Sequence, residues 1–113
     1  MTRGVYLVFT NPVSPEREDD YNDYYANVHI PEVVQSDGIV SARRFKLSDS
    51  KAPIGPVGDF QYVTIYELES DDLAADFEKH QARRDRGELA SSDAMGSPAT
   101  YAVFELLDEH QPG

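Results

Sequence analysis

The stretch FQYVTIYEL, residues 60–68, alternates as a β-strand does, and it is the strongest indication of the fold. Both of its faces are apolar or aromatic, which is typical of a strand covered on both sides. A segment with two Pro and two Gly, residues 48–59, comes before it and predicts a hairpin connection to an earlier strand. One face of the stretch carries Phe60, Tyr62, Thr64, Tyr66 and Leu68, and the other carries Val63 and Ile65.

Elements expected on either side of this strand complete the second half of the chain. Residues 39–47 form the earlier strand of the hairpin. After residue 68, Ser70 is the expected cap of a helix whose first turn holds Asp71 and Asp72, and Gly87 is its expected stop. A polar loop over 88–98, a strand over 100–107 and a tail from Asp108 follow. The apolar stripe of the helix is Leu73, Phe77, His80 and Arg84.

The first half begins with a strand over residues 4–9, which Asn11-Pro12 ends. Ser14-Pro15-Glu16 has the pattern of a helix start, with Ser as the N-cap, Pro at the first helical position and an acidic residue in the first turn. Pro31 removes a backbone donor and disfavours helical geometry at the residue before it, so we expect this helix to break or kink near His29. The helix carries one stripe, formed by Tyr21, Tyr24, Tyr25 and Val28.

The expected element order is β-α-β-β-α-β, which predicts a ferredoxin-like α+β fold. In this fold a four-stranded antiparallel sheet carries both helices on one face, and residues 1–113 form a single domain. Because the strands are apolar on both sides, the other face also needs a cover. The sheet of a second subunit is the simplest cover, so we expect a homodimer.

Composition excludes several classes of function. The formal net charge of −11 repels phosphate backbones and anionic membranes, so neither nucleic acid nor a membrane is an expected partner. The chain has no Cys, which excludes a thiolate nucleophile and a disulfide scaffold. No segment has the apolar length of a membrane span, and the N-terminal apolar run is typical of a strand, so a cytoplasmic location is the expectation. The aromatic residues are seven Tyr and five Phe, and the chain has no Trp. A core this rich in Tyr either is partly wet or lines a pocket, because each buried hydroxyl needs a partner.

His29 is the first candidate for chemistry, because it lies beside Pro31, where backbone groups are freed and a pocket can open. An imidazole titrates near neutral pH and can therefore move protons. Tyr25 lies four residues earlier, on the same helical face, so the pair could converge on one ligand. From spacing alone, the plainer alternative is that His29 hydrogen-bonds the frayed end of the helix.

The segment Tyr24-Tyr25-Ala26-Asn27-Val28-His29-Ile30-Pro31, followed by Asp37-Gly38-Ile39 and Arg43-Arg44-Phe45, resembles the EthD-like family of the dimeric α/β-barrel superfamily. That pattern has an aromatic residue, then His-x-Pro, then a turn into a strand rich in Arg and aromatic residues. The motif covers Tyr24 to Phe45, and the element order extends the resemblance to the whole chain. This chain has Asp37-Gly38 where Pro-Gly is usual and Tyr where Trp is common, which leaves the subfamily and the substrate open.

The resemblance implies a homodimer with a small-molecule pocket between sheet and helices in each subunit. It also implies a cofactor-independent cyclase, isomerase or lyase acting on a small, largely apolar, oxygenated molecule such as a polyketide, lactone or aromatic catabolite. His29 is then the catalytic acid or base and Tyr25 its weaker partner. The alternative is a ligand-binding or accessory protein of a degradation or oxidation pathway, without turnover. Some members of the superfamily oxidise quinol precursors without a cofactor, but nothing in this sequence favours that reaction.

Four further residues are candidates for binding the substrate. Tyr62 and Tyr66 could direct hydroxyls into the pocket, although packing in the core is the favoured interpretation. His80 could approach the pocket from the second helix, although a satisfied, half-buried imidazole is more common. Arg44 and Arg43 should point to opposite faces, and Arg44 could bind an anionic group of the substrate or hold a carboxylate at the dimer interface, although a plain structural or solvated role is the favoured interpretation for both. No metal is expected, because helical spacing scatters the carboxylates of residues 16–23.

Overall fold

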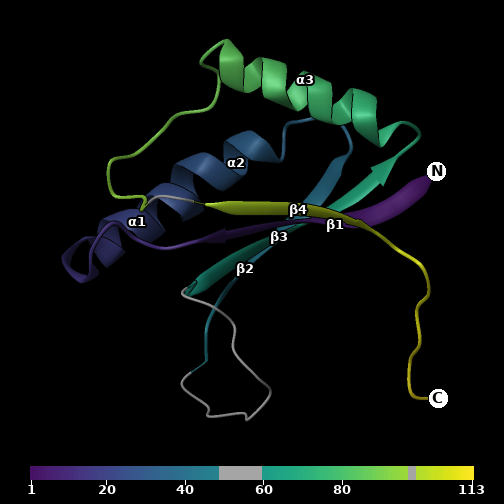
Figure 1. Ribbon diagram of the computed structural model, residues 1–113, viewed down its shortest axis with the longest axis horizontal. Helices are drawn as coiled ribbons and strands as arrows, with labels where there is room; N and C mark the ends of the chain where they lie inside the picture. The colour runs from purple at the N-terminus through teal and green to yellow at the C-terminus, as the bar shows by residue number, and fades with distance from the viewer. Residues whose placement is uncertain (49–59, 97–98) are drawn as a thin grey trace.

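The computed structural model describes residues 1–48, 60–96 and 99–113. Its sheet has the order β2-β3-β1-β4, and every neighbouring pair is antiparallel (Figure 1). The helices lie on one side of this sheet, which confirms the predicted ferredoxin-like α+β architecture. The strands are β1 (Thr2–Thr10), β2 (Ile39–Lys46), β3 (Tyr62–Ser70) and β4 (Thr100–Glu105).

The two central strands place one set of side chains under the helices. In the β1–β3 ladder Tyr6 is opposite Tyr66 and Val8 is opposite Thr64, and all four side chains are buried. The period-two pattern predicted this face correctly. The ladder begins with Thr2 opposite Ser70, so β3 covers residues 62–70 and not the expected 60–68, because β1 offers partners as far as its first residues.

The first helical segment runs on past His29 without a break, but its α-helical geometry is interrupted over Tyr25–His29, where the sequence predicted a break or kink. A 3-10 turn, η1 (Pro15–Arg17), leads into α1 (Glu18–Tyr24), a π-helical turn η2 (Tyr25–His29) and α2 (Ile30–Val33). In the π turn the N–H of Ile30 bonds to the carbonyl of Tyr25, five residues back. The wider turn accommodates the ring of Pro31, which would meet a carbonyl in an uninterrupted α-helix. It also rotates Val28 out of the predicted stripe, and this side chain is exposed.

The second helical segment on this side of the sheet is α3 (Leu73–Asp85). Its N-cap is Asp72, whose side chain accepts a hydrogen bond from the N–H of Ala75, so the predicted cap at Ser70 is wrong. Ser70 instead closes β3 and accepts a bond from the N–H of Asp72. The predicted stop at Gly87 is correct: its φ is +75°, and Gly87 and Glu88 bond back to carbonyls of the last helical turn.

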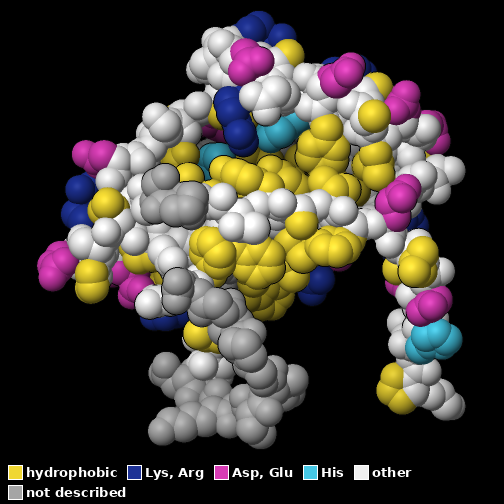
Figure 2. Space-filling view, in the orientation of Figure 1, with side chains coloured by type: hydrophobic (Ala, Val, Ile, Leu, Met, Phe, Trp, Pro, Cys, Tyr) yellow, Lys and Arg dark blue, Asp and Glu magenta, His cyan; other side chains and the backbone are white. Residues whose placement is uncertain are grey.

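The far face of the sheet has no helix or second sheet against it within the described part of the chain, and only the tail after β4 lies against one end of it. Figure 2 shows hydrophobic side chains gathered on the side of the sheet away from the helices. Phe45 and Phe104 are 45% and 56% exposed on this face, which we call the open sheet face. β4 ends at Glu105, two residues before the expected Leu107. Most of the expected hairpin connection, residues 49–59, and the end of the loop over 88–98 lie outside the described residues.

Candidate functional site

A cavity of about 160 Å³ lies between the helix-covered face of the sheet and the helices. We call it the central cavity. β1 and β3 form its floor, η2 and α3 form its walls, and the loop after α3 closes one side. Figure 2 shows His and basic side chains gathered between the helices and the sheet. The polar and aromatic side chains that line the cavity include Tyr6, Tyr24, Tyr25, His29, Tyr66, His80, Arg84 and Tyr101.

His29 lines the central cavity from the π turn, and its closest polar partner is Tyr24. The Tyr24 hydroxyl lies 3.1 Å from Nδ1 of His29 and donates to the carbonyl oxygen of Ala90 at 2.6 Å. A phenol has one proton, so the hydroxyl that donates to Ala90 can only accept from His29. The His29 proton therefore sits on Nδ1, and Nε2 is the basic nitrogen.

Burial controls the protonation of His29. It lowers the pKa of the imidazole to about 4, and the positive charge of Arg84 acts in the same direction. Glu32 opposes this shift, and His80 adds slightly to it. His29 is therefore neutral at pH 7 and can accept a proton but has none to donate from Nε2.

Tyr25, the predicted partner of His29, packs beside it without a hydrogen bond between them. The two ring centroids lie 5.0 Å apart in an edge-to-face arrangement. The Tyr25 hydroxyl donates to Sδ of Met95 at 3.5 Å, which is a weak interaction. Burial raises the pKa of Tyr25 strongly, so the hydroxyl keeps its proton, and a hydrogen bond with Thr10 opposes this rise.

Tyr66 carries an unpaired hydroxyl. Its side chain is 1% exposed, lines the central cavity and has no hydrogen-bond partner among the described residues. Leaving a buried hydroxyl unpaired costs about 1–3 kcal/mol, so such groups usually have a partner. Burial also raises the pKa of Tyr66, which keeps the hydroxyl available as a donor.

His80 lines the cavity from α3, and a hydrogen bond on the side of its ring away from the cavity fixes its position. Its Nδ1 lies 2.6 Å from Oγ of Ser36, which in turn accepts a hydrogen bond from Arg83 at 2.6 Å. Burial and the charges of Arg84 and Arg83 lower its pKa, so this imidazole too is neutral near pH 7. Both predicted imidazoles therefore reach the same cavity.

Tyr62 and Arg44, the other two predicted binding residues, do not line the central cavity. The Arg44 guanidinium lies over the rings of Tyr21, Tyr25 and Tyr62, with 4.8 Å to the Tyr25 centroid, and donates to Oδ1 of Asn22 at 2.9 Å. Such cation–π contacts and a satisfied donor describe packing behind the cavity wall. Arg43 lies on the opposite face, as its alternation with Arg44 predicted, and pairs with Glu67.

Sequence reasoning missed the roles of Tyr24 and Arg84. Tyr24 is the first aromatic residue of the quoted motif, but a regular α-helix would not have placed its hydroxyl on the imidazole five residues later. Arg84 belongs to the predicted stripe of α3, so its direction toward the sheet was available from the periodicity. No three side chains of the metal-binding types gather anywhere in the described part of the chain, and no helix there is long and apolar enough to cross a bilayer.

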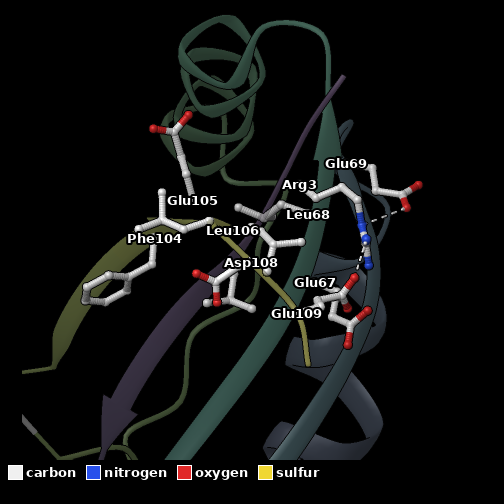
Figure 3. A pocket seen from close by; sticks show the side chains of 12 residues that line it. Arg3, Glu67, Leu68, Glu69, Phe104, Glu105, Leu106, Asp108 and Glu109 are labelled. Atoms are coloured by element: carbon white, nitrogen blue, oxygen red, sulfur yellow. Dashed lines mark hydrogen bonds and ion pairs between the residues drawn. The ribbon is translucent and has the colours of Figure 1, made fainter. Parts of the chain in front are cut away.

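A larger hollow of about 390 Å³ lies elsewhere, between the strands and the tail after β4 (Figure 3). Carboxylates dominate its polar lining, and Arg3 pairs there with Glu69 and Glu109. Its basic group is thus already neutralised, and no imidazole lines it. The central cavity is smaller but holds two neutral imidazoles and an unpaired hydroxyl, so it is the better candidate site.

Solved structures with the same fold span nearly the whole chain. A candidate monooxygenase from Shewanella loihica PV-4 is 17% identical with a TM-score of 0.57, and covers 96% of this chain and 99% of its own. An ethyl tert-butyl ether D (EthD) family protein from Bacillus halodurans C-125 is 14% identical with a TM-score of 0.55, over 95% and 100%. A dimeric ferredoxin-like protein of unknown function from Thermobifida fusca YX is 11% identical with a TM-score of 0.54, over 93% and 92%.

These likenesses confirm the EthD-like, ferredoxin-like fold that the motif around His29 indicated. No curated protein matches the chain. The family model described as "Domain of unknown function (DUF4286)" matches residues 4–94. Because that match covers most of the sequence, the chain belongs to the DUF4286 family.

Proposed function

We propose that the central cavity binds a small, largely apolar, oxygenated molecule and moves a proton next to its carbonyl group without a cofactor. The observation that carries this proposal is the pairing of a basic nitrogen and an unpaired donor in one cavity. His29 offers Nε2 as the base, and Tyr66 offers a buried hydroxyl without a described partner. Cyclisation, isomerisation and retro-aldol cleavage all begin with such a proton transfer.

Each residue has a distinct role in the proposed reaction. Nε2 of His29 removes a proton from the carbon beside the carbonyl, and the resulting enolate oxygen receives a hydrogen bond from Tyr66. A fixed donor aimed at the place where charge develops stabilises the transition state more than the ground state. Tyr25 lines the same cavity and is the second donor, turning its hydroxyl from Met95 and Thr10 toward the bound molecule. His80 contacts the bound molecule from α3.

Hydrogen–deuterium exchange tests the proposal without knowledge of the natural substrate. A panel of small 1,3-dicarbonyl compounds and lactones in D₂O is followed by proton NMR, with wild-type protein and with His29→Ala. We expect wild-type protein to accelerate exchange at the acidic carbon and His29→Ala to lose the acceleration. His110→Ala is the matched control, because His110 lies in the tail and is exposed. Equal exchange by wild type and His29→Ala would contradict the assignment of the base.

A binding role without turnover is the second candidate, and the low pKa of His29 favours it. An imidazole with a pKa of about 4 is a weaker base than an ordinary one, so proton abstraction is harder. A compound that binds the central cavity, exchanges no hydrogen and is recovered unchanged would support this candidate.

We infer that two copies pair through the open sheet face. This face carries Phe45 and Phe104, which are both exposed, and also Leu7 and Ile65, which are half-buried. An apolar face of this kind is rarely left to water in a monomer. The Thermobifida fusca protein of the same fold is described as dimeric.

A further inference from the structure

Arg84 stands at the edge of the central cavity. It belongs to the last turn of α3, lines the cavity, and places its guanidinium 5.8 Å from the centroid of the Tyr101 ring. The pKa of the Tyr6 hydroxyl, which burial raises, is lowered in part by the charge of Arg84 and by a hydrogen bond with it. The cation is therefore directed at the aromatic lining of the cavity.

Arg84 also differs from nearly every other basic residue of the described chain in having no carboxylate partner. The chain carries a net charge of −11, and acids are abundant on its surface. Arg44 lacks a carboxylate as well, but its charge is satisfied by three tyrosine rings and Asn22. The basic residues that do form ion pairs are Arg3, Arg17, Arg43, Lys46, Lys79, Arg83 and Arg86.

The surroundings of Arg84 indicate which kind of anion its guanidinium would bind. A guanidinium binds a carboxylate through two parallel N–H···O bonds, which fixes both the position and the orientation of the acid. One guanidinium balances one negative charge, whereas a phosphate dianion would need further donors. The same cavity is also lined by Val8, Val33 and Leu89, which suit an apolar body.

We propose that the natural ligand of the central cavity is a small carboxylic acid, with its carboxylate on Arg84 and its apolar body directed toward Tyr66. This inference rests on the proposed function for the choice of cavity, and it adds the chemical class of the molecule. The unpaired hydroxyl of Tyr66 then meets a second oxygen of the same ligand. A ligand with an acid at one end and a carbonyl or hydroxyl at the other would satisfy both groups.

Matched acids and esters test the proposal. Benzoate, 4-hydroxybenzoate, cinnamate and hexanoate are titrated into the whole protein by calorimetry at pH 7, each beside its methyl ester. We expect at least one acid to bind at least about tenfold more tightly than its ester, as a charge-assisted hydrogen bond implies. Arg84→Gln should remove the preference, and Arg84→Lys should restore only part of it, because Lys lacks the planar fork.

Arg86→Gln is the matched control, since Arg86 is exposed, as Arg84 is, and lies just past the end of the same helix, but pairs with Glu88 and does not line the central cavity. The proposal is overturned if no acid binds, if esters bind as well as acids, or if Arg86→Gln weakens binding as much as Arg84→Gln. Circular dichroism of each variant verifies that it is folded. The acid preference needs no turnover, so it can hold where the exchange assay with His29→Ala fails, and it can fail where that assay succeeds.

Discussion

The hydroxyl of Tyr24 accepts from Nδ1 of His29 across 3.1 Å while its own proton goes to the carbonyl of Ala90 at 2.6 Å. Because the Tyr24 hydroxyl gives its only proton to Ala90, the proton shared with His29 must belong to Nδ1, and this fixes the imidazole tautomer. The two bonds also tie the helical π turn to the loop after α3, because the N–H of Ala90 donates in turn to Glu32 of α2. Tyr24 is thus a positioning residue for His29, acting through the imidazole and without contact to the proposed reacting atoms.

Tyr24→Phe should release the tautomer of His29. Without the hydroxyl, the Nδ1 proton loses its acceptor and part of the imidazole population moves its proton to Nε2, where it blocks the base. We expect deuterium exchange to slow by about tenfold or more, with the unfolding free energy lowered by about 1–3 kcal/mol. Nitrogen-15 chemical shifts of the imidazole report the tautomer directly.

Tyr21→Phe serves as the control for this variant. It removes a buried hydroxyl that bonds to Thr10, outside the central cavity, so it costs stability of the same order. It should leave the nitrogen shifts of His29 unchanged. If Tyr24→Phe behaved like Tyr21→Phe in the nitrogen spectrum, the positioning role would be wrong.

The titration of His29 should appear both in stability and in activity. Its folded pKa is about 4, below the ordinary value of 6.5, so the unfolded chain binds more protons between these values. Stability is therefore complete above about pH 6.5 and falls as the pH drops toward 4. The groups that face His29 are Arg84 and His80 from α3, Glu32 from α2, and the aromatic pair Tyr24 and Tyr25.

Proton NMR of the imidazole between pH 3 and 8 measures this pKa, and urea unfolding across the same range measures the linkage. Deuterium exchange should be flat above pH 6 and decline on an acidic limb near the same pKa. A midpoint near 6.5 in the folded protein would show that the ring is solvated and that burial does not control it.

Tyr66→Phe should separate binding from stability. The hydroxyl has no described partner, so its removal abolishes a desolvation cost, and we expect the unfolding free energy to stay equal or rise by up to about 1 kcal/mol. Tyr21→Phe, which breaks a bond to Thr10, should instead destabilise by about 1–3 kcal/mol. Affinity for the acids that bind wild-type protein should fall in Tyr66→Phe and persist in Tyr21→Phe. Destabilisation by Tyr66→Phe would reveal a structural partner for this hydroxyl.

The sequence predicted the strands and their faces better than it predicted the site. Alternation over Tyr62, Thr64 and Tyr66 fixes which side of the sheet they occupy, because the period of a strand allows no other choice. The course of the helix through Pro31 was not predictable in the same way. Local sequence rules predict that a Pro breaks a helix. The π turn that accommodates Pro31 instead depends on the packing of Tyr24 and Tyr25 against the sheet, which is a tertiary effect.

The same limit explains the outcome for the binding residues. Periodicity placed His80 and Tyr66 on faces that reach the central cavity, but it placed Tyr62 on the same face of the same strand. Tyr62 lies four residues from Tyr66, packs against Arg44 and Tyr21, and does not line the central cavity. Which member of a stripe meets a cavity depends on where the helices cross the sheet, and that information is not local.

The open sheet face leads to the last prediction. Wild-type protein should be a dimer in light scattering after gel filtration, and Phe104→Glu should be a monomer, because a carboxylate buried between two apolar sheets would lose its hydration without gaining a partner. Phe104 pairs across β4 and β1 with Val5, at a point where the exposed side chain can be changed without entering the helix-covered core. Val28→Glu is the control, because it introduces the same carboxylate at an exposed apolar residue on the helix side of the sheet. A monomeric wild-type protein would contradict the dimer, and a dimer that persists in Phe104→Glu would place the interface away from the open sheet face.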